Sequence, residues 1–395
     1  MQTFAASAPK NIAIIDFLNQ DPGLKLLYRE EADYFVYETQ PNLTLPHRLQ
    51  FYKMHGLYEP TQLSTDNEDE IARILRPYSI LFVVCSIVSC VSSFSTFPVN
   101  ITSEHLLRTL RVIQKCRPHL QTVTFFDNSD YDACPYDLLF VRAANRAVMT
   151  NTFEMTTNGE QKCFFLKRAF ALDMNSCPPH KYAACVYPFP YIMFGYNCNI
   201  DIITRFRNGG GGGAAALPRL FFAGAIYRHT NVEWGVDRDR ETCVTNVANE
   251  LTRLEMQSVI CFYCFPCIDY ENYIGEMSAS MFCLDVPGAG DPNKRTFEIL
   301  ASGTTLRMAG PFAGPHKLPI TFATHVMANV APEDADELCD GFVMFFDEHD
   351  LCRKIQQLLR DPELYKRCLR HQNKIVEKYM NPRAIRASID KHLFT

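Results

Sequence analysis

The chain has 395 residues, of which 47% are hydrophobic and 21% are charged. This is an ordinary globular composition, and at roughly 150–200 residues per domain the length indicates two domains. It excludes a mainly disordered chain, a coiled coil and a collagen-like fibre. Lys and Arg number 39 against 44 Asp and Glu, a net charge of −5. The chain therefore has no excess of positive charge, which would have indicated a nucleic acid or an anionic membrane as partner.

The sixteen cysteines are spread along the whole chain. Disulfide frameworks belong to short secreted domains, so we interpret these residues as mostly buried thiols and predict a cytoplasmic protein. The start of the chain, MQTFAASAPKNIAIIDF, lacks the basic segment and long apolar core of a signal peptide. Residues 79–103 carry no charge and are long enough to span a bilayer, but serines make their second part poorly hydrophobic. We therefore predict a buried strand followed by a polar loop there, and no integral membrane segment.

The first half of the chain alternates short apolar runs with amphipathic stretches. We expect strands at 11–16, 33–39, 80–86, 122–127 and 137–142, and helices at 67–75 and 103–116. Strand runs that are apolar throughout and separated by helices are typical of parallel sheets covered on both faces. The first half therefore predicts an α/β domain.

Five consecutive glycines and three alanines occupy residues 209–216. Such a run cannot hold a regular element, so we predict a flexible linker or loop insertion between one domain at 1–208 and another at 217–395. The second half repeats the alternation, with strands expected at 219–224, 258–264, 281–286 and 341–346 and helices at 240–255, 294–302 and 348–360. Two α/β domains in tandem predict a ligand cleft between the carboxyl ends of their strands.

A glycine-containing loop, PGAGDPN, follows the predicted strand at 281–286. Gly288 and Gly290 allow the backbone to approach a ligand closely. The helix predicted after the loop offers unpaired N–H groups and the positive end of its dipole, which favour a diphosphate.

Two charged residues lie in the first turns of that helix, which ends before Gly303. The charge of Arg295 opposes the helix dipole, which indicates that an anion is supplied from outside. Glu298 is three residues further on and can accept hydrogen bonds from two neighbouring ribose hydroxyls. The alternative is a glycine loop followed by a solvated arginine and glutamate.

The segment FCLDVPGAGDPNKRTFEILASGT resembles the nucleotide-sugar motif of two-domain GT-B glycosyltransferases. The closest forms are the exostosin-like enzymes and the "glycosyl transferases group 1" family related to CgeB proteins; Arg295, Glu298 and Gly303 match their pattern. RLFFAGAIYRHTN resembles the first strand and loop of the same domain, and the segment from GFVMFFDEHD to IVEKY resembles its C-terminal part. TVTFFDNSD and CFFLKRAF resemble pieces of the first domain. The resemblance covers most of residues 217–395 but only short, separate segments of the first half.

The resemblance implies two Rossmann-like domains facing each other across a cleft, the acceptor on the first and a nucleotide diphosphate sugar on the second. It implies that Gly224 and Arg228 lie near the donor phosphates, with Arg295 sharing the charge. The expected reaction moves the sugar to a hydroxyl of a glycan, a glycoprotein or a small molecule, without a metal and without a permanently bound cofactor. Gly290 stands where many retaining enzymes carry a second glutamate, so retention and inversion both stay open.

Candidates for acid–base chemistry lie in both halves. Asp130 follows the strand predicted at 122–127, where it could accept the proton of the acceptor hydroxyl. His229 could be a base or a phosphate donor, although an exposed loop histidine is the default. Asp130 and Asp132 also form the Asp-x-Asp spacing of metal-dependent glycosyltransferases, which is one alternative function. A second alternative is a non-catalytic interaction protein that keeps the GT-B fold.

Two further patterns are weaker. Cys261, Cys264 and Cys267 have a spacing that suits zinc or an iron–sulfur cluster, but no fourth ligand follows and the aromatic neighbours favour a buried strand. No glycine fingerprint of a dinucleotide fold follows the first strand, which argues against an NAD-dependent oxidoreductase. The sugar, the acceptor and the oligomeric state are left open by the sequence.

Overall fold

The computed structural model forms two compact units, each built on a parallel β-sheet. The first unit contains Met1–Ala169, Asp173–Asn197 and Arg386–Thr395, and the second contains Phe170–Leu172 and Cys198–Ile385. The structure describes residues 11–17, 23–37, 57–58, 60–63, 67–85, 99–127, 148, 162–167, 186–188, 217–226, 228–231, 236–264, 268–286, 295, 298–299, 318–322, 342–379 and 382–394.

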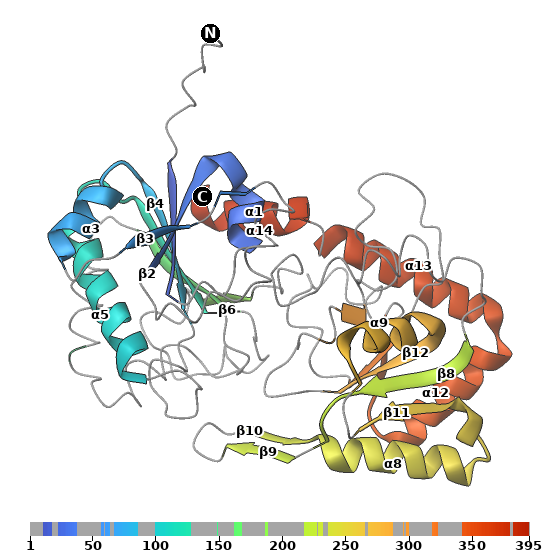
Figure 1. Ribbon diagram of the computed structural model, residues 1–395. Helices are drawn as coiled ribbons and strands as arrows, with labels where there is room; N and C mark the ends of the chain where they lie inside the picture. The colour runs from blue at the N-terminus through green and yellow to red at the C-terminus, as the bar shows by residue number, and fades with distance from the viewer. Residues whose placement is uncertain are drawn as a thin grey trace. The chain divides into compact units, whose positions relative to one another are not determined.

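The first unit contains a seven-stranded sheet in the order β3-β2-β1-β4-β5-β6-β7, in which all neighbouring strands are parallel. Its strands are β1 Ile12–Asp16, β2 Ala32–Tyr37, β3 Thr61–Leu63, β4 Ile80–Cys85, β5 Thr122–Asp127, β6 Lys162–Lys167 and β7 Val186–Pro188. Every residue of β1 and β4 is buried, because helices cover both faces of the sheet (Figure 1).

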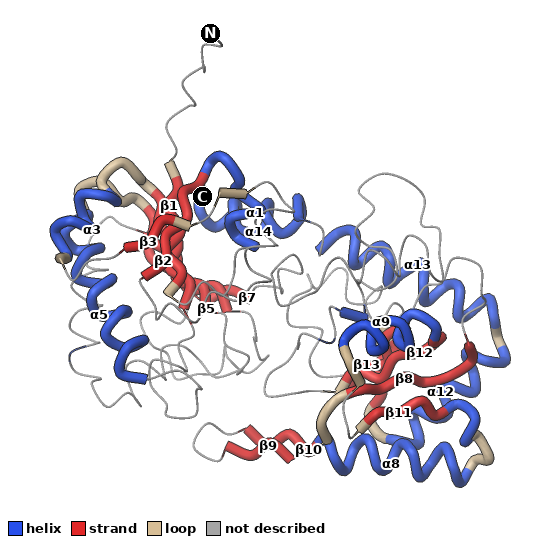
Figure 2. Tube along the Cα trace, in the orientation of Figure 1, coloured by secondary structure: helices blue, strands red, loops and turns tan. Residues whose placement is uncertain are grey.

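The helices of this unit lie on both sides of its sheet (Figure 2). They are α1 Gly23–Tyr28, the 3-10 turn η1 Arg29–Glu31, α3 Glu68–Leu75, α5 Val99–Cys116 and the end of α14 Pro382–Phe394. Asn67 caps α3 by accepting a hydrogen bond from the backbone N–H of Asp69 at 3.0 Å. On α5, Arg111 donates to Glu68 at 2.6 Å, which ties the exposed sides of the two helices together.

The last residues of the chain belong to the first unit, although the sequence places 217–395 together. Arg386 of α14 donates to both carboxylate oxygens of Glu31, each at 2.6 Å. Its guanidinium lies 4.9 Å from the ring centroid of Tyr28, whose hydroxyl donates to Asp390 at 3.0 Å. These contacts explain why the end of α14 packs with α1.

The second unit contains a five-stranded sheet in the order β11-β8-β12-β13-β14, also parallel throughout. The strands are β8 Leu217–Ala223, β11 Ile260–Tyr263, β12 Ser280–Asp285, β13 Leu318–Phe322 and β14 Val343–Phe345. A two-stranded antiparallel ribbon, β9 Arg228–Asn231 with β10 Val236–Asp239, follows β8. The helices are α8 Arg240–Arg253, η8 Gln257–Val259, α9 Tyr270–Ala279, α12 Glu348–Arg360 and α13 Pro362–Tyr379.

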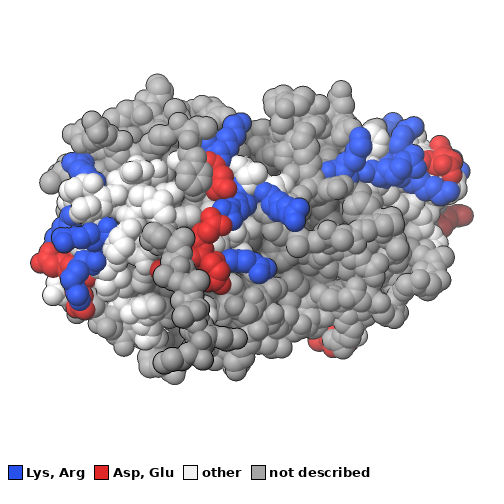
Figure 3. Space-filling view, turned by 90° about the horizontal axis from the view of Figure 1, so that it is seen from above, with Lys and Arg blue, Asp and Glu red and all other residues white. Residues whose placement is uncertain are grey.

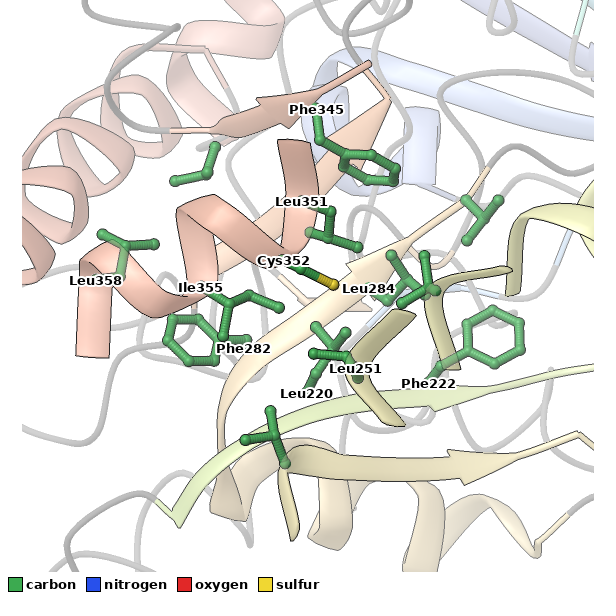
Figure 4. Close-up of a cluster of buried hydrophobic side chains, with 14 of the residues drawn as sticks. Leu220, Phe222, Leu251, Phe282, Leu284, Phe345, Leu351, Cys352, Ile355 and Leu358 are labelled. Atoms are coloured by element: carbon green, nitrogen blue, oxygen red, sulfur yellow. The ribbon is translucent and has the colours of Figure 1, made fainter. Parts of the chain in front are cut away.

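Side chains of β8 point alternately to two buried clusters. Leu220 and Phe222 pack in the larger cluster, which α8 and α12 complete (Figure 4). Phe221 and Ala223 pack on the other face, where α9 contributes Met277. Burial on both faces explains why the last four residues of β8, Leu220–Ala223, are all apolar and show no alternation.

The exposed side of α13 is basic. Lys366, Arg367, Arg370 and Lys374 are all exposed, and Lys and Arg side chains gather over this helix in Figure 3. Lys366 pairs with Glu363 at 2.8 Å. Cys368 and Leu369 are buried, so the basic stripe is the solvated face of an amphipathic helix.

The predicted fold class, α/β with two Rossmann-like parallel-sheet domains, is confirmed. The segment after residue 79 forms the buried strand β4, and within the described ranges no helix is long and apolar enough to cross a membrane. The strand predicted at 137–142 and the glycine run at 209–216 lie outside the described residues. The chain passes between the units after Ala169, Leu172, Asn197 and Ile385. The predicted boundaries at 1–208 and 217–395 and the linker between them stay predictions.

Candidate functional site

The candidate site lies at the carboxyl edge of the second sheet, where β8 and β12 end. Gly224 follows β8 directly, and its N–H donates to the carbonyl of Tyr263 on β11 at 3.1 Å. Arg295 and Glu298 are helical residues that come after β12 in the chain. The carboxyl edge of a parallel sheet is where α/β proteins bind ligands.

Gly224 and Arg295, which the sequence places 71 positions apart, meet at this edge. Gly224 has a φ of +152°, and a Cβ built there would overlap the Nη2 atom of Arg295 and lie 3.3 Å from its Cζ. The guanidinium carbon of Arg295 lies 4.6 Å from the ring centroid of Phe222. The backbone conformation therefore favours glycine, and any larger residue at this position displaces the guanidinium of Arg295.

Glu298 is buried, with 4% of its surface exposed, instead of lying on an open wall of the site. Its Oε1 accepts a hydrogen bond from the hydroxyl of Tyr270 at 3.1 Å, and its Oε2 accepts one from Tyr273 at 2.9 Å. Both tyrosines come from α9, and neither was predicted from the sequence as a site residue. The available signal was Asp269, a capping residue directly before two tyrosines at i, i+3 spacing.

The hydroxyl of Tyr273 is held as a hydrogen-bond donor. Burial, followed by the charge of Glu298, raises the pKa of this phenol well above its ordinary value. The ring lies 5.8 Å from those of Phe221 and Tyr270 and packs against the buried cluster that contains Ile299. Tyr273 therefore stays protonated and has a fixed position beside the carboxylate.

The other predicted site residues are only partly described. Arg228 and His229 form the first two positions of β9, paired with Asp239 and Arg238 of β10. Asp239 also caps α8 by accepting from the N–H of Thr242 at 2.8 Å, so the ribbon leads directly into that helix. Gly288, Gly290, Asp130 and Asp132 lie outside the described residues, and their roles stay predictions.

Two further carboxylates lie buried at strand ends and were not singled out from the sequence. Asp285 ends β12 with 4% of its surface exposed. Asp16 ends β1 in the first unit and accepts a hydrogen bond from the hydroxyl of Tyr34 at 2.6 Å. The Tyr34 contact joins β1 to β2 and gives Asp16 a structural role.

The cysteine pattern belongs to the strand predicted for it. Cys261 lies within β11 and Cys264 follows it, while Cys267 lies outside the described residues. Burial raises the pKa of both described thiols. In the part of the chain that the structure describes, no group of His, Cys, Asp and Glu side chains is placed to hold a metal ion.

Similarity to solved structures extends over nearly the whole chain. A UDP-GlcNAc 2-epimerase from Neisseria meningitidis bound to UDP-GlcNAc is 9% identical, over 97% of this chain and 99% of that one, with a TM-score of 0.44. An α,α-trehalose-phosphate synthase (UDP-forming) from Burkholderia vietnamiensis is 11% identical over 97% and 99%, with a TM-score of 0.45. A trehalose-6-phosphate structure from E. coli bound with UDP-2-fluoro glucose is 8% identical over 98% and 99%, with a TM-score of 0.47.

No protein-family model matches the chain, and no curated protein sequence matches it. The exostosin-like or CgeB-like family assignment therefore stays a prediction. Because the structural similarities combine low identity with TM-scores below 0.5, a functional assignment depends on this chain's own residues.

Proposed function

We propose that the protein is a glycosyltransferase of the two-domain GT-B type, which moves a sugar from a nucleotide diphosphate sugar to an acceptor hydroxyl. The observation that supports this most directly is the close approach of Arg295 to Gly224 at the end of β8, with Glu298 three residues after Arg295 in the chain. A guanidinium suits a diphosphate, and a carboxylate one helical turn away suits the diol of a ribose.

Each residue has a distinct part in the proposed reaction. Arg295 binds the donor diphosphate and stabilises the charge that develops on it as the sugar leaves. Glu298 accepts hydrogen bonds from the ribose hydroxyls and so orients the donor. Gly224 leaves room for Arg295. Asp130 removes the proton of the acceptor hydroxyl, and His229 acts beside the phosphates.

The remaining predicted contacts complete the donor site. Gly288 and Gly290 allow the backbone to approach the donor, and Arg228 adds a second positive charge near the phosphates. With that charge supplied by arginines and N–H groups, the proposed reaction needs no metal ion.

A ligand screen tests the use of a nucleotide. Because a ligand that binds only the folded protein raises its melting temperature, UDP, GDP, ADP and CMP and their sugars are compared by thermal shift. We expect one nucleoside diphosphate and its sugar to stabilise the protein clearly more than the others. If none of them raises the melting temperature at millimolar concentration, the proposed function is wrong.

The Glu298→Gln variant tests the placement of the site. It keeps the shape of the side chain but removes its charge, so nucleotide affinity measured by calorimetry should fall by about 10–100-fold, equivalent to ~1.5–3 kcal/mol. Glu363→Gln is the matched control, because Glu363 is exposed on α13 of the same unit, where it pairs with Lys366 at 2.8 Å. Equal affinities in Glu298→Gln and the control would remove Glu298 from the donor site.

A further inference from the structure

We propose that Tyr270 and Tyr273 are positioning residues that hold Glu298 in the orientation that receives the donor ribose. They would thereby set a preference for a ribonucleotide over a 2′-deoxyribonucleotide. The inference rests on the proposed function, because it concerns the same donor site, but it assigns to α9 a part in selecting the ligand.

The geometry places one phenol on each oxygen of the carboxylate. Tyr270 donates to Oε1 at 3.1 Å and Tyr273 donates to Oε2 at 2.9 Å. Each carboxylate oxygen accepts about two hydrogen bonds, so a phenol on one oxygen does not by itself prevent that oxygen from accepting a ribose hydroxyl. Two fixed donors, one on each oxygen, leave the plane of the carboxylate little freedom to rotate.

The two tyrosines are themselves held by the ends of α9. Asp269 caps the helix by accepting from the N–H of Asn272 at 3.0 Å. At the other end, Arg219 of β8 donates to Ser280 at 2.9 Å and pairs with Glu276. A helix anchored at both ends carries its side chains with little positional variation.

The phenols also make a buried anion tolerable. A carboxylate with 4% exposure loses most of its hydration, and hydrogen bonds to its charged form offset that cost. Arg295 acts electrostatically on Tyr273, so its positive charge lies in the same region. Glu298 thus accepts a hydrogen bond on each oxygen, and acceptance of hydrogen bonds is the property that a ribose diol needs.

Discrimination between a ribonucleotide and a deoxyribonucleotide follows from the burial of Glu298. A deoxyribose lacks one hydroxyl, so it leaves part of a buried carboxylate without its ligand hydrogen bond, and buried groups left unpaired give strong selection. If the phenols are removed, Glu298 rotates to other partners, and the ribonucleotide loses more affinity than the deoxyribonucleotide. The ratio of the two affinities therefore reports positioning, whereas a loss of folding lowers both affinities together.

The experiment uses the full chain and measures UDP and 2′-deoxy-UDP by calorimetry, or the matching pair for another base selected in the screen. Tyr270→Phe, Tyr273→Phe and the double variant are compared with Tyr365→Phe. Tyr365 donates to the carbonyl of Met281 at 3.2 Å in the same unit and serves as the control for the loss of a phenol. We expect the wild type to prefer the ribonucleotide at least tenfold, and the double variant to lose most of that preference.

The outcomes separate the two proposals. An unchanged affinity ratio in the double variant overturns the role of the tyrosines and leaves the nucleotide-binding function standing. Equal binding of both nucleotides by the wild type also overturns this inference. Absence of any nucleoside diphosphate binding by the wild type overturns the proposed function as well. A reduced ratio in the double variant with an unchanged ratio in Tyr365→Phe supports it.

Discussion

Gly224→Ala is the substitution for which the structure predicts the sharpest local effect. The new Cβ falls on the Nη2 atom of Arg295, so the guanidinium must leave its place over the ring of Phe222. The backbone must also keep a φ of +152°, which residues other than glycine rarely adopt. The variant therefore combines backbone strain with the displacement of a proposed ligand-binding group.

The two contributions have separate magnitudes. Holding alanine in a sparsely populated backbone conformation costs about 1–3 kcal/mol. Displacing a guanidinium from an aromatic ring at 4.6 Å costs a further ~0.5–2 kcal/mol, the larger value applying where the pair is desolvated. The second unit should therefore lose about 1.5–5 kcal/mol of unfolding free energy.

The assay exploits the only tryptophan of the chain, Trp234, which belongs to the second unit. Urea unfolding followed by Trp234 fluorescence reports that unit, and a double-mutant cycle with Arg295→Ala separates the two contributions. With Arg295 truncated, only the backbone cost of Gly224→Ala remains. Nucleotide affinity, measured in parallel, should fall in the single variant because the guanidinium is displaced.

Two results would refute this reasoning. If Gly224→Ala unfolds at the urea concentration of the wild type, neither the strain nor the overlap is real. If its cost is the same with and without the Arg295 side chain, the close approach of the two residues does not exist in solution. Ala225→Gly is the control, because it changes an exposed neighbour without adding a Cβ.

The remaining predictions concern stability and metal. Arg386→Ala should destabilise the first unit by ~1–2 kcal/mol in chemical denaturation followed by near-ultraviolet circular dichroism, since it loses two hydrogen bonds to Glu31 and a ring contact. The hydrogen bond to Glu250 raises the pKa of His349, so this pair should stabilise the fold fully below about pH 6.5 and lose its effect as pH rises through the raised pKa. The difference in unfolding free energy between wild type and His349→Gln should therefore be larger at pH 6 than at pH 8.5. An equal difference at the two pH values would refute this prediction. Donor hydrolysis or transfer should persist in excess EDTA, because Arg295 and helix N–H groups supply the positive charge; loss with EDTA and recovery with Mn²⁺ would favour the Asp-x-Asp alternative.

Strands buried on both faces could be predicted from the sequence. Ile80–Cys85 is apolar throughout and every residue of it is buried, so composition alone located β4. The same holds for Phe221 and Phe222, which pack on opposite faces of the second sheet. Where a strand has no exposed face, nothing in its surroundings can overrule its local pattern.

Strands with weaker patterns were missed for identifiable reasons. β13 contains Pro319, and proline argues against an inner strand because it cannot donate a ladder hydrogen bond. The register explains the exception: Pro319 pairs with Cys283 of β12, but pairing with β14 begins only at Ile320. β3 is a three-residue strand at the edge of its sheet with two exposed residues, too short to show a period.

The candidate site also has features that the sequence predicts and features that only the fold creates. The spacing of Arg295 and Glu298 could be predicted because three residues along a helix place two side chains on neighbouring positions. The partners of Glu298 could not, because Tyr270 and Tyr273 lie more than twenty residues upstream and only the folded sheet brings α9 beside the carboxylate.

This difference changes what Glu298 can be expected to do. A solvated carboxylate exchanges hydrogen bonds with water and discriminates weakly between ligands, because a missing hydroxyl is replaced by a water molecule. A carboxylate with 4% exposure has no such replacement, so each absent ligand hydroxyl costs more. The phenols of Tyr270 and Tyr273 donate one hydrogen bond to each oxygen of that buried carboxylate. Selectivity for the donor would therefore depend as much on α9 as on the helix that carries the motif.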